Sequence, residues 1–119
     1  MPQRTLIIIR KPPFGSVDSW EGLRLSLSFY ASGLPVEILL EGVGLFNWLK
    51  GITPVSVDPQ SVSRFATDIE KFELPVFVVA EDLANLGLNQ DDLVSTYPKI
   101  ISRNDAALMI GAHEMTISV

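Results

Sequence analysis

The chain has no cysteine and only one histidine among its 119 residues. The absence of cysteine excludes disulfides, thiolate metal sites and cysteine nucleophiles within this chain. The single histidine, His113, excludes a pair of histidines that act together in catalysis or share a metal ion. We therefore expect no metal, no cofactor and no enzymatic activity of its own.

Long apolar runs and an excess of basic residues are also missing. No run approaches the roughly 20 apolar residues that a membrane-spanning helix needs, and the apolar stretch Leu6 to Ile9 is too short for a signal peptide. The net charge of −5, without a basic stripe, argues against nucleic acid as a direct partner. These observations predict a soluble, cytoplasmic protein that makes no membrane contact.

The length and the hydrophobic content bound the architecture. A chain of 119 residues fits a single domain, 1–119. A hydrophobic content of 47% with a mean hydropathy of +0.30 is high for one soluble domain of this size. Surplus apolar surface of this kind usually belongs to a subunit interface, so we expect an oligomer.

Short apolar runs alternate with capped, amphipathic segments along the whole chain. Alternating β and α elements predict a three-layer, flavodoxin-like α/β domain with a five-stranded, mainly parallel sheet. Continuous apolar strands are typical of a sheet that is covered on both faces. The predicted strands are Thr5–Arg10, Val36–Leu40, Val76–Val79, Lys99–Ile101 and Met115–Val119.

Two of the predicted helices carry more apolar side chains than one core can cover. Leu25 and Phe29 lie opposite the expected sheet-facing side of the first helix, and Phe46 and Trp48 belong to a short helix whose apolar residues spread over a wide arc. We predict that these four residues contact another subunit. The expected sheet-facing residues of the first helix, which runs from Asp18 to Ser32, are Trp20, Leu23, Leu27, Tyr30 and Ala31.

A candidate anion site lies at the carboxyl ends of the first two strands, where open α/β sheets bind ligands. Two cations follow the first strand, and a Gly-Ser pair before the next helix offers backbone N–H groups. A Glu-Gly pair ends the second strand and could face this site. The alternative is a solvated strand end with a structural ion pair or glycine turn, because the spacing matches no phosphate-binding loop. The candidate residues are Arg10, Lys11, Gly15, Ser16, Glu41 and Gly42.

The remaining polar residues predict no further site. Asp82, Asp91 and Asp92 lack the alternating ligand spacing of a calcium loop, so we expect them at helix ends and in loops. His113 has only Glu114 as a titratable neighbour in the sequence, which favours a surface or helix-end histidine over a catalytic one.

Four segments, in their order along the chain, carry a resemblance to a known family. They are Leu6-Ile-Ile-Ile-Arg-Lys-Pro-Pro-Phe-Gly-Ser, Trp20-Glu-Gly-Leu-Arg-Leu-Ser-Leu, Leu39-Leu-Glu-Gly-Val and Val78-Val-Ala-Glu-Asp-Leu-Ala-Asn-Leu-Gly-Leu. Together they resemble the DsrE/DsrF/DsrH-like family, and its TusC/DsrF branch most. The resemblance implies a flavodoxin-like α/β subunit that assembles into homo- or hetero-oligomers, often hexamers.

The sequence departs from this family at the position that matters for its chemistry. Some subunits of the family carry a cysteine just after the third strand, which accepts a persulfide sulfur and passes it on. Here Val79 or Ala80 occupies that position, so the chain cannot carry sulfur itself. We expect a non-catalytic subunit of a sulfur-relay-type complex, in which a homologous partner supplies the thiol. The alternative is a homo-oligomeric module that binds a small anion or nucleotide in the crevice of the candidate site, with Val79 and Ala80 beside it.

Overall fold

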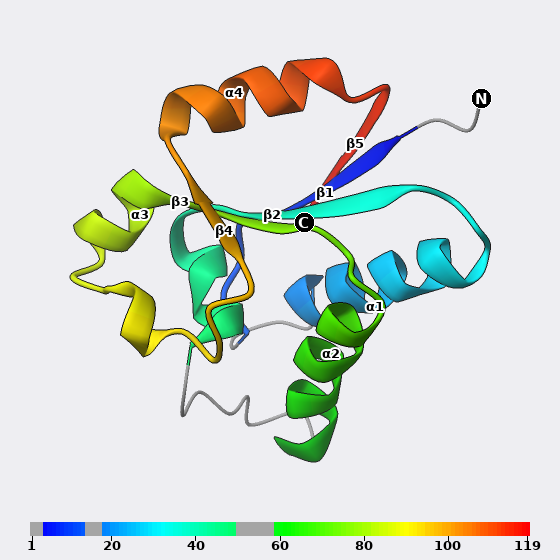
Figure 1. Cartoon of the computed structure of the whole chain (residues 1–119), viewed down its shortest axis with the longest axis horizontal. Coiled ribbons are helices and arrows are strands. Elements are labelled where there is room, and N and C mark those ends of the chain that lie inside the picture. Colours follow the sequence, from blue (N-terminus) through cyan, green and yellow to red (C-terminus); the bar gives the residue numbers. More distant parts are fainter. Residues whose placement is uncertain (1–3, 14–17, 50–58) are drawn as a thin grey trace.

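The five strands of this chain form one sheet in which every neighbouring pair is parallel, in the order β4-β3-β2-β1-β5. The computed structural model describes residues 4–13, 18–49 and 59–119 (Figure 1). Each predicted strand is present, two of them one residue shorter than expected. The elements are β1 (Thr5–Ile9), α1 (Asp18–Ala31), β2 (Val36–Leu40), η1 (Gly42–Trp48), α2 (Pro59–Lys71), β3 (Val76–Val79), α3 (Ala80–Asn85), η2 (Gln90–Asp92), β4 (Lys99–Ile101), α4 (Arg103–Ala112) and β5 (Met115–Ser118).

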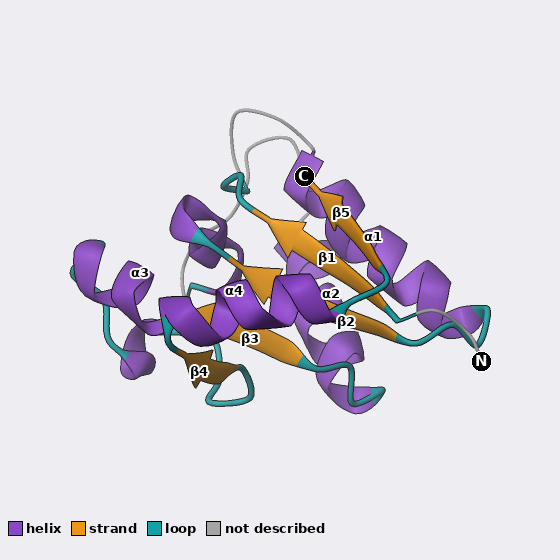
Figure 2. Cartoon of the chain, turned by 90° about the horizontal axis from the view of Figure 1, so that it is seen from above, coloured by secondary structure: helices purple, strands orange, loops and turns teal. Residues whose placement is uncertain are grey.

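Helices cover both faces of the sheet, as the prediction of a three-layer α/β fold requires. Helices α1 and α2 lie on one face, and α4 runs across the other (Figures 1 and 2). The strand order differs from the 2-1-3-4-5 order of flavodoxin itself, because the chain builds four strands in one direction and then returns past β1. Strand β5 therefore forms one edge of the sheet, beside β1. Within the described ranges, no helix is long and apolar enough to cross a membrane.

The core lies on both sides of the central strands. All five residues of β1 are buried, because α1 contacts one face of this strand and α4 covers the other. Alternate strand residues face α1 and α2, and the others face α4. The buried strand residues of the α1 and α2 side are Ile7, Ile9, Val36, Ile38, Leu40, Val76 and Val78, and those of the α4 side are Leu6, Ile8, Leu39 and Val79.

The sheet-facing side of α1 differs from the prediction. Besides Leu23, its buried residues are the small Ser19, Gly22 and Ser26. A Cβ atom on Gly22 would stand 2.7 Å from a side-chain carbon of Val119, so the helix approaches the sheet more closely than a row of large side chains would allow. The periodicity found the right helix and two of its core-facing residues, Leu23 and Leu27, but it missed the small residues that allow the close approach.

Of the other large residues that were expected to face the sheet, Leu27 is half-buried against the core, whereas the two aromatic residues pack against other segments. Trp20 meets the ring of Phe65 in α2 edge to face, with ring centroids 4.7 Å apart. Tyr30 stacks on Phe72 at 4.8 Å and remains 43% exposed. The prediction was therefore wrong for both aromatic residues, and also for Ala31, which is exposed. The aromatic side chains of α1 pack against α2 and against the turn that follows it.

Of the four predicted interface residues, Trp48 requires a correction. Its side chain is 1% exposed and belongs to the chain's own core, so it is not available to another subunit. Its helix, η1, packs against α3. Leu25, Phe29 and Phe46 are half-buried rather than fully exposed, and the first two pack on the margin of the core.

Candidate functional site

The carboxyl ends of the strands bring together polar residues from distant parts of the chain. Arg10 follows β1 and Glu41 follows β2, and the Nε of Arg10 donates a hydrogen bond to Oε2 of Glu41 at 2.8 Å. The Nη1 of Arg10 also donates to Oγ of Ser118, the last residue of β5, at 2.8 Å. Arg10 thus bonds to the ends of β2 and β5, the two strands that flank β1, through the Nε and Nη1 atoms of its guanidinium group.

Two further residues, which the sequence did not assign to the site, lie at the same carboxyl ends of the strands. Arg103, the first residue of α4, lies 3.5 Å from Oε1 of Glu41 and forms an ion pair with Asp82 of α3. The other carboxylate oxygen of Asp82 accepts a hydrogen bond from the backbone N–H of Gly42 at 2.7 Å. An unbroken chain of charge pairs therefore runs from the end of β1 to the start of α4.

Local backbone structure explains why these residues meet. Gly42 has φ +52°, a left-handed conformation that favours glycine, at the turn where its N–H meets Asp82. Asp82 lies in the first turn of α3, where a helix stabilises an anion. Glu81 accepts the backbone N–H of Arg103 at 2.8 Å, which satisfies one of the unpaired donors at the start of α4. The network therefore joins the first turns of two helices.

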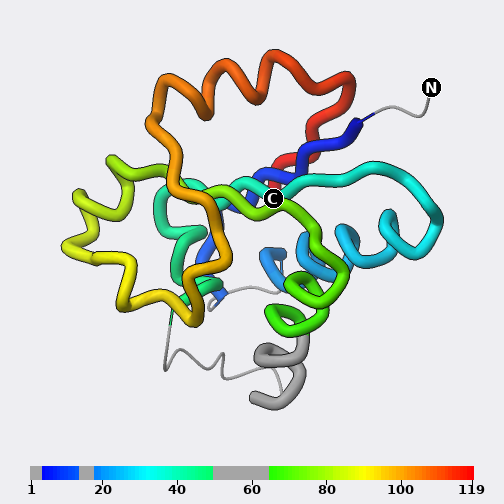
Figure 3. Tube along the Cα trace, in the orientation of Figure 1, coloured from blue at the N-terminus to red at the C-terminus, as the bar shows by residue number. Residues whose placement is uncertain are grey.

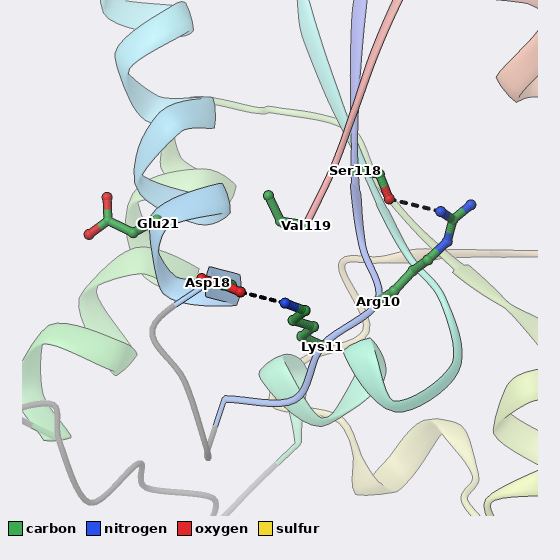
Figure 4. A pocket seen from close by; sticks show the side chains of 6 residues that line it. All are labelled: Arg10, Lys11, Asp18, Glu21, Ser118 and Val119. Carbon is green, nitrogen blue, oxygen red and sulfur yellow. Dashed lines mark hydrogen bonds and ion pairs between the residues drawn. The ribbon is translucent and has the colours of Figure 1, made fainter.

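A pocket of about 400 Å³ opens beside this network, between the end of β5 and the start of α1 (Figure 4). The Nζ of Lys11 lies 2.5 Å from a carboxylate oxygen of Asp18 across it. The pocket thus contains two cations and two carboxylates, and an incoming anion has to compete with acids already paired to those cations. The lining residues are Arg10, Lys11, Asp18, Glu21, Ser118 and Val119.

The predicted site residues are only partly brought together. Arg10, Glu41 and Gly42 belong to the charge network, and Lys11 faces the adjoining pocket. Gly15 and Ser16 lie outside the described residues. In the part of the chain that the structure describes, no three acids or histidines gather in a way that could hold a metal ion.

Val79 and Ala80, the two residues that the sequence resemblance singled out, lie next to the network. Val79 is the last residue of β3 and is fully buried, and Ala80 begins α3 and is half-buried. Two residues further on, Asp82 is 5% exposed and bonded on both carboxylate oxygens. The end of β3 therefore presents apolar side chains beside an ion pair whose carboxylate is bonded on both oxygens.

Arg103 and Asp82 are the residues that sequence reasoning missed. A usable signal was present, because Arg103 follows the predicted strand Lys99–Ile101 and the carboxyl ends of parallel strands meet at one edge of a sheet. Which ends are neighbours depends on the strand order, and the sequence did not give that order.

His113 does not belong to this network of charged residues. It is the residue that ends α4, as a helix-end histidine should be, but it is buried rather than on the surface. Its Nδ1 lies 2.7 Å from the carbonyl oxygen of Met109, and its Nε2 lies 2.7 Å from Glu37 in β2. Because a carbonyl oxygen only accepts, Nδ1 is the donor in the contact with Met109. This pair attaches the end of α4 to the sheet.

Comparison with known proteins shows the fold. No protein-family model matches the sequence, and no curated protein matches it either. The solved structure of the ychN protein from E. coli superimposes with a TM-score of 0.82 at 17% identity, over 98% of this chain and 99% of that one. MTH1491 from Methanobacterium thermoautotrophicum, a protein of unknown function, gives a TM-score of 0.69 at 12% identity, with coverage of 98% and 99%. This chain therefore shares the architecture of small α/β proteins, and at these identities the likeness extends to the fold alone.

Proposed function

We propose that this chain is a non-catalytic, DsrE/DsrF-like subunit of an oligomeric sulfur-relay-type complex, in which a homologous chain supplies the thiol. The family-like order of its segments and the shared small α/β architecture support this proposal. The absence of cysteine limits the role to an accessory one.

One observation carries the proposal: the end of β3 is built for stability rather than for reaction. Val79 is fully buried, and Asp82 is held by Arg103 and by the backbone N–H of Gly42. A nucleophile at this place needs access to solvent or to a donor protein, and here the nearby acid is already bonded on both oxygens. A chain of this kind can complete the site of a partner by contact, without entering the chemistry.

Two measurements test the proposed function. Native mass spectrometry of the chain mixed with a cysteine-bearing homologue of the same fold should show a hetero-oligomer. Incubation of the pure chain with a persulfide donor should leave its mass unchanged, whereas the homologue should gain the mass of one sulfur atom. Failure of every such homologue to bind, or a stable sulfur adduct on this chain, would overturn the proposal.

The pocket beside β5 supports a second candidate function, the binding of a small anion or nucleotide without enzymatic activity. Arg10 and Lys11 line this pocket, and their side chains are 51% and 54% exposed. The double replacement of both cations by alanine should then weaken binding of inorganic phosphate or a nucleotide in calorimetry, and added salt should mimic that loss. Lys99→Ala, at the opposite end of the sheet, is the matched control. Absence of heat from phosphate and nucleotides alike would exclude this candidate.

A further inference from the structure

Strand β5 is a short edge strand that contains no charged residue, proline or bulge. It pairs with β1 on one side, and no other segment in the described ranges pairs with its outer side. Natural edge strands are normally guarded by charged residues, proline or a bulge. Strand β5 reads Met-Thr-Ile-Ser, and its register with β1 is continuous. An edge of this kind is a ready template for another strand.

The direction of its backbone groups follows from the bonds to β1. The N–H groups of Met115 and Val119 donate to carbonyl oxygens on the β1 side, those of Arg4 and Ile8. Successive residues of a strand point their backbone groups to opposite sides. Thr116 and Ser118 therefore direct their N–H and C=O groups away from the sheet.

A groove lies beside this edge, on the α1 face of the sheet. It has a volume of about 230 Å³, and Leu25 and Val119 are among its lining residues. Ile117 packs on the core on that same face. A strand added to β5 would place its apolar side chains over this groove.

We propose that a second copy of this chain adds its own β5 antiparallel to this edge, which joins two five-stranded sheets into one of ten strands. Pairing of the outward-facing groups sets the register: Thr116 lies opposite Ser118 of the partner subunit, and Ile117 lies opposite Ile117 of the partner subunit. This inference deepens the oligomeric part of the proposed function and rests on it, but it requires nothing about sulfur transfer.

The chemistry of β5 favours a copy of itself over an unrelated strand. About a two-fold axis at Ile117, apolar residues meet apolar residues on the groove side, and Thr116 meets a serine on the other side, a favourable cross-strand pair. The charges at the two ends are also complementary. Glu114 precedes β5, and Arg10 lies beside its far end. Antiparallel pairing brings each Glu114 toward the Arg10 of the partner subunit, and both are exposed.

The decisive variant is Thr116→Pro. Proline is tolerated on an edge strand where its missing N–H faces outward, so the bonds to β1 remain intact while a bond to the second copy is lost and the ring obstructs pairing. We expect a dimer of the pure wild-type chain in analytical ultracentrifugation and a dissociation constant about tenfold or more higher in the variant, because one lost hydrogen bond alone approaches that factor. Thr116→Val, which keeps the N–H but loses the hydroxyl, should have a dissociation constant nearer to that of the wild type than Thr116→Pro has. Circular dichroism checks that each variant is folded.

Cross-linking tests the register in a chain that has no cysteine to interfere. Residues at a two-fold position of this type lie about 4.5 Å apart between Cα atoms, within the range of a disulfide. Ile117→Cys should therefore form a covalent dimer under mild oxidation. Thr116→Cys is the matched control, because its two copies lie on a diagonal of about 7–8 Å, beyond disulfide reach.

A monomeric wild type, a dimer that Thr116→Pro leaves intact, or equal cross-linking of the two cysteine variants would overturn the inference. The proposed function fails separately. A chain that is monomeric alone but binds a cysteine-bearing homologue would exclude the β5 dimer and retain the accessory role. A chain that forms the β5 dimer but binds no homologue would retain the dimer and exclude the accessory role.

Discussion

Arg103 and Asp82, which are 21 residues apart in the sequence, form an ion pair at the edge of the sheet where β3 and β4 end. Asp82 is buried, whereas the side chain of Arg103 is 49% exposed. The carboxylate also holds the backbone of Gly42, so it connects three segments of the chain.

We predict that Asp82→Ala lowers the free energy of unfolding by about 1–3 kcal/mol, because the N–H of Gly42 and the guanidinium of Arg103 both lose their acceptor. Arg103→Ala should cost less, since its partner keeps the bond from Gly42. Urea denaturation of the two single variants and the double variant measures the coupling, which we expect to be at least about 0.5 kcal/mol. Exposed Asp91→Ala is the control and should stay within about 0.5 kcal/mol of the wild type. A double variant that is simply additive would contradict the network.

Gly44 should tolerate no side chain. A Cβ atom at this position would lie 2.0 Å from the carbonyl oxygen of Ile9, so backbone would have to move. We expect Gly44→Ala to lower the free energy of unfolding by at least about 2 kcal/mol. Gly111→Ala is the matched control, because its Cβ has open space in α4 and alanine favours a helix by up to about 1 kcal/mol. Equal effects of the two changes on the urea midpoint would contradict the close approach at Gly44.

Glu114 should contribute to stability in a pH-dependent way. Its own backbone N–H and that of Arg4 donate to the carboxylate, and these bonds hold the pKa of Glu114 below its usual 4.5. A carboxyl group with a lowered pKa stabilises the fold at pH values above its usual pKa. This contribution is lost as the pH falls through the folded-state pKa. We therefore expect the difference in urea midpoint between the wild type and Glu114→Gln to narrow as the pH is lowered below about 4.5. A constant difference across that range would contradict the prediction.

Tyr97 should make the stability of the fold depend on pH in the alkaline range. Burial, together with the charges of Glu73 and Glu70, raises the pKa of Tyr97 above the usual 10.0, and its hydroxyl donates to the carbonyl oxygen of Leu74 at 2.6 Å. Tyr97→Phe should cost about 1 kcal/mol near neutral pH, the usual contribution of one hydrogen bond. Because Tyr97 ionises at a lower pH in the unfolded chain than in the folded one, the stability advantage of the wild type over Tyr97→Phe falls as the pH rises above about 10. Thermal unfolding of both proteins across that range provides the measurement.

The three central strands, β1, β2 and β3, could be predicted from the sequence because each is a short apolar run between residues that end helices or turns. Such a run has one stable place in an α/β domain, buried between two layers of helices. The fourth strand was the hardest of the five, since Lys99 and Ile100 are exposed and the strand has only three residues.

The details that the sequence missed all depend on which elements are neighbours. Helix α1 does have an apolar arc, but Trp20 and Tyr30 pack on Phe65 and Phe72 rather than on the sheet. The residue of α1 that approaches the sheet closely is Gly22. Trp48 was expected at an interface because no single face of η1 gathers its apolar residues, and yet it is buried within the chain. Periodicity describes one helix at a time and contains no information about its surroundings.

The candidate site was found at the correct edge but with incomplete membership. Arg10 and Glu41 were predicted from the rule that parallel strands present their carboxyl ends together, and they form an ion pair. Arg103 obeys the same rule, but its contact with Glu41 requires the order of the strands. Binding of an anion at this edge stays a prediction.

The pairing of β1 with β5 has a consequence for how the protein folds. Thr5 and Met115 are register partners although 110 positions separate them, and Figure 3 shows the first strand (blue) and the last (red) side by side. Contacts between residues so distant in the chain slow folding, because a long loop must close before they form. During synthesis on the ribosome, the outer side of β1 has to wait for β5, which follows the other four strands of the sheet along the chain. A nascent chain of this protein therefore exposes β1 as a temporary edge strand until β5 has been synthesised.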